Sequence, residues 1–224
     1  MSIVRALRAV FAVVVPLLLI GLTTPAQAAD WPTPVRVVNR VTTSEPVVFI
    51  TLDDGWNHDP AAQNLLLDRR VPASLFLLPG AYSYDAGYFH TLLDHGPARV
   101  ENHTVDHPNL TTMDAAGQRG QLCAAREKAL AEFGQEPRLA RPPYGAYNDT
   151  TRVVARACGA KALVTWTYDF TTWSGVTPPT PALKSGDIVL LHFNETVAVD
   201  LARALAAADA AGLRPAPLRD YIPD

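Results

Sequence analysis

The sequence predicts an α/β fold, in which about seven parallel strands are covered by helices as a sheet that is either open or closed into a barrel. Two observations support this prediction. Short apolar, β-branched runs alternate with helical patterns along the chain, and no linker interrupts the alternation. Polar side chains also follow directly after several of the expected strands, where parallel α/β proteins build their active sites.

The expected strands are short, apolar and rich in β-branched residues. Residues 47–52, with the sequence VVFITL, show this pattern most clearly and are typical of a buried strand. The other strands are expected at residues 73–78, 99–102, 138–140, 161–166, 187–191 and 213–218.

Helical patterns separate these strands. The longest predicted helix spans residues 114–133 and ends at Gly134, a residue that readily adopts the left-handed conformation after a helix. A helix at residues 149–158 is expected to begin with Asn148 or Asp149 as its N-cap. The remaining helices are expected at residues 60–70, 87–95 and 196–211, and a Pro-rich loop at residues 175–184.

The start of the chain has the pattern of a targeting signal. An apolar run of only 13 residues follows Arg5 and Arg8, and small residues end the segment at Ala28 and Ala29. This pattern predicts a secretory signal peptide over residues 1–29. The alternative is an uncleaved anchor helix, but the run is shorter than the roughly 20 residues that span a bilayer. We therefore expect a secreted protein with no stable membrane anchor after cleavage.

Composition limits the function of the mature chain, expected at residues 30–224. Removing Arg5 and Arg8 with the signal leaves 17 basic and 22 acidic side chains, a net charge of −5. This charge argues against nucleic acid as a partner, because binding to phosphates requires a basic surface. The length suits one domain, which we expect to be a monomer.

Two cysteines, Cys123 and Cys158, form an even pair in the exported chain. Disulfides persist outside the cytoplasm, and both residues fall in segments predicted to be helical. We expect a bridge between the two helices, with two buried free thiols as the alternative.

Five polar clusters follow the expected strands and should converge at one edge of the sheet. Taken alone, each cluster has an ordinary structural explanation. An acidic pair is typical of a solvated turn, two histidines four residues apart are typical of the protein surface, and a histidine at the end of a strand is typical of the core. Together, Asp54, His103 and His107 offer one oxygen and two nitrogens, the ligand set of a catalytic zinc ion. The clusters are Asp53 with Asp54, His103 with His107, residues 141–145, Asp169 with Trp173, and His192.

The ordered motifs resemble those of the polysaccharide deacetylase family, the NodB-homology domain of carbohydrate esterase family 4. The family's TFDDG motif stands as TLDDG at residues 51–55, and HTxxHP as HTVDHP at residues 103–108. RxPYG stands as RPPYG at residues 141–145, and the L-x-H motif as LLH at residues 190–192. The resemblance spans about residues 47–192 and implies a single distorted (β/α) barrel with its active site at the strand C-terminal ends.

The resemblance also implies an activity, the hydrolytic removal of acetyl groups from N-acetylated or O-acetylated sugars of a polysaccharide. It implies one divalent metal, zinc, held by Asp54, His103 and His107. Asp53 would accept the proton of the attacking water, and Arg141 would orient Asp53. His192 would donate a proton to the leaving group. The backbone N–H of Tyr144 would donate a hydrogen bond to the oxyanion, and Leu190 and Trp173 would form the walls of the acetyl pocket.

One motif departs from the family pattern. Thr172 stands where the family has a second aspartate before the tryptophan, and that acid helps to orient the arginine. The absence of this acid affects how the ionisation of the catalytic base is controlled and how the substrate is positioned, although Asp169 can supply part of the missing negative charge. Two alternatives therefore stay open: a glycan-binding pseudoenzyme, and a metal-dependent amidohydrolase acting on a small non-sugar amide.

The polymer itself is left open by the sequence. Peptidoglycan, chitin oligomers and acetylated xylan all fit, and we favour a polymer of N-acetylglucosamine. The Pro-rich loop, Trp56 and the aromatic residues in 82–88 are expected to border a glycan groove.

Overall fold

The computed structural model describes residues 32–223, so the expected signal peptide lies outside the described residues and stays a prediction. Within that range nine strands form one parallel sheet, in the order β1-β6-β5-β4-β3-β2-β8-β7, with β9 paired to β2. The strands are β1 (Arg36–Val38), β2 (Val47–Asp54), β3 (Ser74–Leu77), β4 (Arg99–Asn102), β5 (Leu139–Ala140), β6 (Ala162–Val164), β7 (Tyr168–Asp169), β8 (Ile188–His192) and β9 (Arg214–Pro215).

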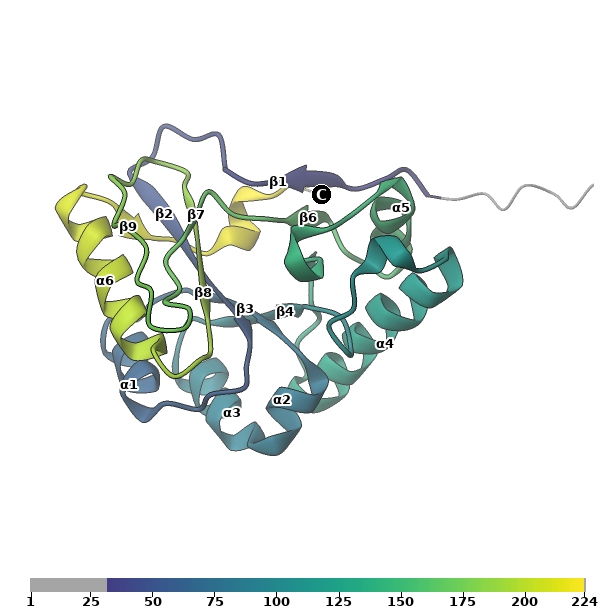
Figure 1. Cartoon of the computed structure of the whole chain (residues 1–224), viewed down its shortest axis with the longest axis horizontal. Helices are drawn as coiled ribbons and strands as arrows, with labels where there is room; N and C mark the ends of the chain where they lie inside the picture. Colours follow the sequence, from purple (N-terminus) through teal and green to yellow (C-terminus); the bar gives the residue numbers. More distant parts are fainter. Residues whose placement is uncertain (1–31, 224) are drawn as a thin grey trace, which may run out of the picture. The chain divides into compact units, whose positions relative to one another are not determined.

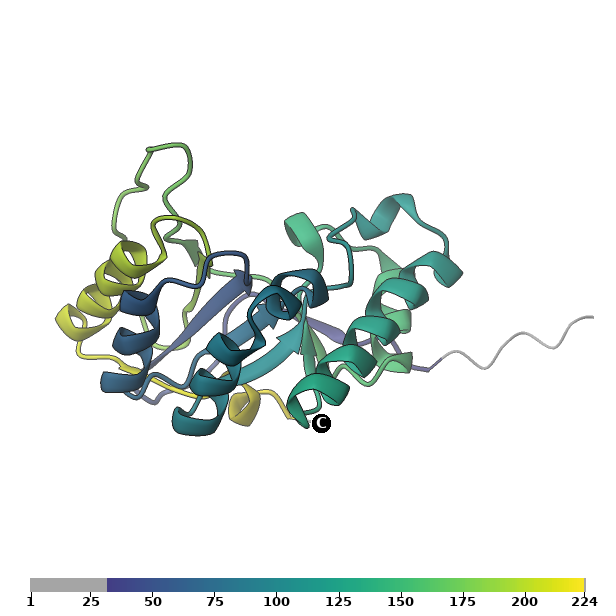
Figure 2. The ribbon, with the colours of Figure 1, turned by 90° about the horizontal axis from the view of Figure 1, so that it is seen from below.

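In the described part of the chain, six α-helices cover the outer side of the curled sheet. Figure 1 shows them as an arc that runs from α6 past α1, α3 and α2 to α4 and α5, and Figure 2 shows the same helices from below. They are α1 (Pro60–Asp68), α2 (Pro79–Tyr84), α3 (Ala86–His95), α4 (Ala115–Phe133), α5 (Asp149–Ala157) and α6 (Val197–Ala210), with short 3-10 turns at Leu110–Thr112, Pro143–Gly145 and Leu218–Tyr221.

The expected α/β fold is confirmed, and the sheet is a distorted barrel that does not close, since β1 and β7 form its two ends. Three elements were not predicted: β1, β7 and α2. The two strands have only three and two residues, too few for an alternating pattern to be recognised. The helix has six residues and begins with Pro79 and Gly80, which read as a turn in the sequence.

Strand β2 places the site because its two faces differ. Val48, Ile50 and Leu52 point to the helices and join the larger apolar core. Val47 and Phe49 point to the opposite, inner face and pack with Phe76 and Ile188. Since side chains alternate along a strand, Thr51 and Asp53 continue this inner face, which turns from apolar to polar at the carboxyl end of β2.

Local signals set the helix ends as expected. The Asn148 side chain accepts from Thr151 N, and the Thr151 side chain accepts from Asn148 N, which forms a capping box at the start of α5. Gly134, with φ of 63°, ends α4 in the left-handed conformation.

None of the helices in the described range has both the length and the apolar character needed to cross a membrane.

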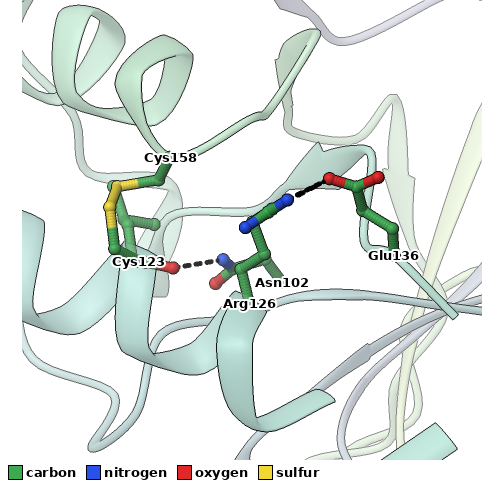
Figure 3. Close-up of a disulfide and its surroundings, with 6 residues drawn as sticks. Asn102, Cys123, Arg126, Glu136 and Cys158 are labelled. Carbon is green, nitrogen blue, oxygen red and sulfur yellow. Dashed lines mark hydrogen bonds and ion pairs between the residues drawn. A yellow bond between two sulfur atoms is a disulfide. The ribbon is translucent and has the colours of Figure 1, made fainter. Parts of the chain in front are cut away.

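The predicted disulfide between Cys123 and Cys158 is present and joins α4 to the end of α5 (Figure 3). Beside it, the Asn102 amide donates to the Leu122 carbonyl at 2.7 Å, and Arg126 pairs with Glu136. Asn102 ends β4, so the bridge braces the helix that contacts the strand leading into the two motif histidines.

Candidate active site

The carboxyl ends of β2, β4 and β8 meet the loops after β5 and β7 around a cavity of about 200 Å³. All five polar clusters expected from the sequence contribute residues to it, together with the expected pocket residue Leu190. The cavity is lined by Asp53, Asp54, His103, His107, Pro142, Tyr144, Trp166, Asp169, Trp173, Leu190 and His192. Arg141 lies beneath the lining and is fully buried.

Asp54, His103 and His107 lie close enough to share one ion. One ligand atom from each residue lies within 4.8 Å of the others. Asp54 Oδ1 is 3.5 Å from His103 Nε2 and 3.7 Å from His107 Nε2. Asp54 Oδ1 is also buried without a hydrogen-bond partner, which is costly for a carboxylate unless a cation is bound there. This donor set therefore fits a divalent metal such as zinc.

A second contact orients the buried histidine. His103 Nδ1 lies 2.8 Å from the Arg141 carbonyl oxygen. A carbonyl only accepts, so Nδ1 carries the proton and the lone pair of Nε2 faces Asp54. This is the tautomer that a metal ligand requires.

The electrostatics of the three donors favour a positive charge between them. Burial alone would lower the pKa of His103, but the carboxylates of Asp53 and Asp54 outweigh it and raise the pKa above its usual value. Burial would raise the pKa of Asp54, yet the close approach of His103 and the charges of the neighbouring histidines lower it. Burial and the charge of His103 lower the pKa of His107. The charges of these three side chains are therefore coupled to one another.

The loop carrying the histidines is held in an unusual backbone conformation. Thr104 and His107 have φ values of 71° and 57°. Asn102 Oδ1 accepts from Thr104 N at 2.9 Å, and Thr104 Oγ1 accepts from His107 N at 3.1 Å. Gln121 of α4 accepts from the backbone N–H groups of residues 105 and 106, both at 3.0 Å. The role of Gln121 was not predicted, because a glutamine within a helix has no distinctive sequence signal.

Asp53 is held by Arg141. Arg141 Nη1 donates to Asp53 Oδ1 at 2.6 Å and to Thr51 Oγ1 at 2.9 Å. The guanidinium also donates to the carbonyls of Val164 and Thr165 and lies 4.2 Å from the centre of the Phe76 ring. With Oδ1 fixed in this way, Asp53 Oδ2 lies 3.7 Å from His103 Nε2, beside the metal-binding set.

His192 ends β8 directly beside Asp53 of β2. Its Nδ1 forms a 2.8 Å hydrogen bond with Thr171 Oγ1, and its ring centre lies 4.6 Å from that of Trp173. Leu190 is buried at the base of the cavity. Thr171 was not among the predicted residues, since a threonine in a loop has no distinctive sequence signal.

Tyr144 has a φ of 61°, and its exposed ring packs edge-on against His107 at 4.7 Å.

Asp169 accepts from Thr171 N at 2.8 Å. Burial lowers the pKa of Arg141, and the negative charge of Asp169 partly opposes this effect. Thr172, in place of the expected acid, donates from both N and Oγ1 to Asp200 of α6. Asp200 was not predicted, because it lies in an Ala-rich helix outside the motifs.

Two larger cavities, each of about 600 Å³, flank the catalytic cavity. Both are lined by Asp54 and by Trp56, whose side chain is 59% exposed. The expectation that the aromatic residues in 82–88 border a groove is wrong for Tyr82 and Tyr88, which pack in the core. The Tyr82 ring packs edge-on against Phe133 of α4, and the Tyr88 ring packs edge-on against Phe89 and Phe193.

Comparison with known proteins agrees with this geometry. Residues 40–163 match the polysaccharide deacetylase family. An uncharacterised protein of Streptomyces coelicolor is 38% identical over 205 residues, covering 88% of this chain and 82% of that protein. A chitooligosaccharide deacetylase of Sinorhizobium fredii is 32% identical over 166 residues, covering 70% of this chain and 76% of that protein.

A solved family 4 carbohydrate esterase from Bacillus anthracis has the same fold, with a TM-score of 0.69 at 22% sequence identity. The match covers 83% of this chain and 86% of that one. The chain belongs to the polysaccharide deacetylase family, the NodB-homology domains of carbohydrate esterase family 4.

Proposed function

We propose that this protein is a secreted, metal-dependent deacetylase that hydrolyses acetyl groups from N-acetylated sugars within a glycan chain. The observation that carries the proposal is one 200 Å³ cavity that holds three metal-ligand side chains, an arginine-bound carboxylate and a histidine. A glycan-binding protein would need neither the carboxylate nor the histidine in this arrangement. Thr172, which favours the pseudoenzyme alternative, forms its hydrogen bonds with Asp200, Thr177, Asn194 and Thr196 and not with the three ligand side chains.

Asp54, His103 and His107 would hold the metal, and zinc suits a donor set of one oxygen and two nitrogens. A divalent ion held there would acidify a water molecule and polarise an acetyl carbonyl. The protein's own contribution is geometric. The Arg141 carbonyl fixes the ring of His103, and the hydrogen-bonded loop after β4 fixes His107.

Asp53 would act as the general base. Its Oδ1 is occupied by Arg141, so Oδ2 is the atom that takes a proton from the attacking water. As the water oxygen bonds to the acetyl carbon, negative charge develops on the carbonyl oxygen, and the backbone N–H of Tyr144 would donate to it. Leu190 and Trp173 provide apolar walls for the acetyl methyl group.

His192 would act as the general acid. Its Nδ1 is engaged with Thr171, which leaves Nε2 as the atom that gives a proton to the leaving nitrogen. The carbon–nitrogen bond then breaks, and acetate and a free amine are formed. An acetyl ester would react in the same way, with an alcohol as the leaving group.

The flanking cavities favour a polymer over a small amide. Each has the size of a site for a drug-sized ligand, so sugar units on either side of the reacting one have space to bind. Trp56 borders both cavities and offers an exposed aromatic face. The name of the Sinorhizobium fredii relative supports N-acetylglucosamine as the repeating sugar.

The experiment that tests the proposal is an acetate-release assay on chitin oligomers, peptidoglycan and acetylated xylan, with metal content measured on the same samples. Release from chitin oligomers that a chelator stops and zinc restores supports the proposal. A zinc-loaded protein that releases acetate from none of the three supports the pseudoenzyme. Release from a small non-sugar amide alone supports the amidohydrolase.

Secretion is proposed from the pattern of residues 1–29. Expression of the full chain in a bacterium, followed by N-terminal sequencing of the protein in the medium, tests it. The expected first residue is Ala29 or Asp30. An intact Met1 on membrane-bound protein would instead support the anchor.

A further inference from the structure

A carboxylate outside the sequence motifs is buried next to the active site. Asp200, on the first turn of α6, is 1% exposed. Acidic residues are common in the first turn of a helix, where they normally face water and interact with the helix dipole. A buried carboxylate has to be compensated by donors, so its position calls for an explanation beyond the helix itself.

Four donors surround Asp200, and two of them come from one residue of a distant loop. Thr172 donates from Oγ1 to Oδ1 at 2.7 Å and from its backbone N to Oδ2 at 2.8 Å. Thr196 Oγ1 donates to Oδ2 at 2.7 Å, and Arg203 Nη2 to Oδ1 at 3.1 Å. These bonds lower the pKa of Asp200 even though burial by itself would raise it.

Arg203, one turn further along α6, holds the same loop at two more points. Its guanidinium donates to the carbonyls of Phe170 and of Pro178, the second at 2.9 Å. It also lies 5.1 Å from the centre of the Phe170 ring. Asp200 and Arg203 together fix the residues on both sides of Thr171.

Thr171 connects this clamp to the cavity. It lies between Phe170, which Arg203 holds, and Thr172, which Asp200 holds, so its hydroxyl has little freedom to move. That hydroxyl forms the 2.8 Å hydrogen bond with His192 Nδ1. Trp173, the next residue after Thr172, packs against the His192 ring.

We propose that Asp200 and Arg203 are positioning residues for His192. They fix residues 170–173, so that Thr171 and Trp173 hold the imidazole with Nε2 directed at the leaving group. Neither side chain lines the 200 Å³ cavity, so neither acts on substrate directly. The proposal rests on the proposed function, in which His192 is the proton donor.

Asp200→Asn is the main test. The asparagine amide would place N–H groups opposite Thr172, Thr196 and Arg203, which are themselves hydrogen-bond donors. We expect kcat to fall by about 100-fold, the effect of a small displacement of a reacting group. Zinc content should stay at the wild-type value, since the ligands lie on β2 and after β4. The matched control is Asp209→Asn, on the same helix, whose exposed carboxylate pairs with Arg69. That control should keep the wild-type kcat.

A double-mutant cycle separates positioning from general destabilisation. If Asp200 acts through Thr171 and Trp173, the double variant Thr171→Val/Asp200→Asn should lose less kcat than the product of the two single losses, because the contact of Thr171 with His192 is already gone. Losses that multiply in the double variant would overturn the proposal, as would a wild-type kcat for Asp200→Asn.

Milder variants are available where Asp200→Asn does not fold. Thr172→Ser keeps the hydroxyl that donates to Asp200, and Thr172→Val removes it at similar volume. The serine variant should keep kcat and the valine variant should lose it. Equal kcat for both contradicts the clamp.

A readout without turnover distinguishes failure of this inference from failure of the proposed function. The ring signals of His192 in ¹H–¹⁵N spectra should shift or broaden in Asp200→Asn or Thr172→Val. Unchanged signals would overturn the positioning role, whereas shifted signals in a protein that releases no acetate would reject only the proposed function.

Discussion

Arg141 Nη1 lies 2.6 Å from Asp53 Oδ1, and the arginine that makes this contact is completely buried. One carboxylate oxygen is therefore fixed, and the other is left to the cavity. Asp54, the next residue, has a φ of 70° and turns its carboxylate towards the two histidines instead. Two adjacent acids thereby obtain different partners, one an arginine and the other the two histidines of the candidate metal site.

Asp53→Asn separates these two roles. The variant should bind zinc with the wild-type stoichiometry and lose acetate release by about 10²–10⁴-fold, the usual contribution of a general base. Initial rates of acetate release and metal analysis of the same sample are the measurements. Asp54→Asn is the comparison, since it should lose both zinc and activity. Wild-type rates in Asp53→Asn would show that another group is the base.

Zinc should stabilise the folded protein as well as activate it. A ligand that binds only the folded state at 100 times its Kd adds about 2.7 kcal/mol to the free energy of unfolding. Thermal unfolding of the chelated protein should accordingly shift to higher Tm when zinc is added. His103→Ala should remove that shift, and Asp53→Asn should keep it. A Tm that is independent of zinc in the wild type contradicts the metal site.

The bridge between Cys123 and Cys158 closes a loop with a sequence separation of 35. In the chain-entropy account a bridge of this length contributes about 3–4 kcal/mol. The double variant Cys123→Ser/Cys158→Ser should lose that amount in denaturant unfolding. Reductant should destabilise the wild type equally and leave the double variant unchanged. A reductant effect on both proteins would mean that another process is being measured.

Trp56→Ala should affect long substrates only. Its exposed ring borders both flanking cavities and not the catalytic one. We expect kcat/KM on a chitin tetramer to fall about tenfold, or about 1.4 kcal/mol, with no change on a small acetyl ester. Tyr84→Ala, at an 85% exposed tyrosine, is the control. Equal losses on both substrates would place Trp56 in the chemistry rather than in glycan binding.

Asp200 should make stability depend on acid pH. Its pKa in the folded protein is lowered, so its contribution is present above the unfolded value of about 3.9 and is lost as the pH falls through the folded value. The difference in unfolding free energy between wild type and Asp200→Asn should therefore be largest near neutral pH and shrink below pH of about 4. Urea titrations at several pH values measure it. A constant difference would mean that the carboxylate is not ionised in the folded state.

The strand ends were the predictable part of this protein. Asp53 and His192 follow continuous apolar runs, and the carboxyl ends of parallel strands meet at one edge, so their convergence could be expected. The strands β1 and β7 could not be expected from the sequence. They are strands because they pair with β6 and β8, and their own two or three residues carry no recognisable strand pattern.

The supporting contacts were equally hidden. Gln121 and Asp200 lie on helices and act on loops 15 to 28 residues away. Periodicity shows which face of a helix is apolar but not which loop a single polar side chain reaches. The substitution at Thr172 was visible in the sequence, whereas the carboxylate that meets it comes from another element.

The left-handed backbone at the site has a consequence for engineering this enzyme. Six non-glycine residues in the range 32–223 have positive φ, and four of them belong to the site: Asp54, His107 and Tyr144 line the cavity, and Thr104 lies between the two motif histidines. Each such conformation costs of the order of 1–3 kcal/mol, and glycine would relieve it. A library selected for heat resistance alone would therefore enrich glycine at these positions, which include the candidate metal ligands Asp54 and His107. Stability and turnover are opposed at these four residues, so a thermostable variant should be sought with all four kept unchanged.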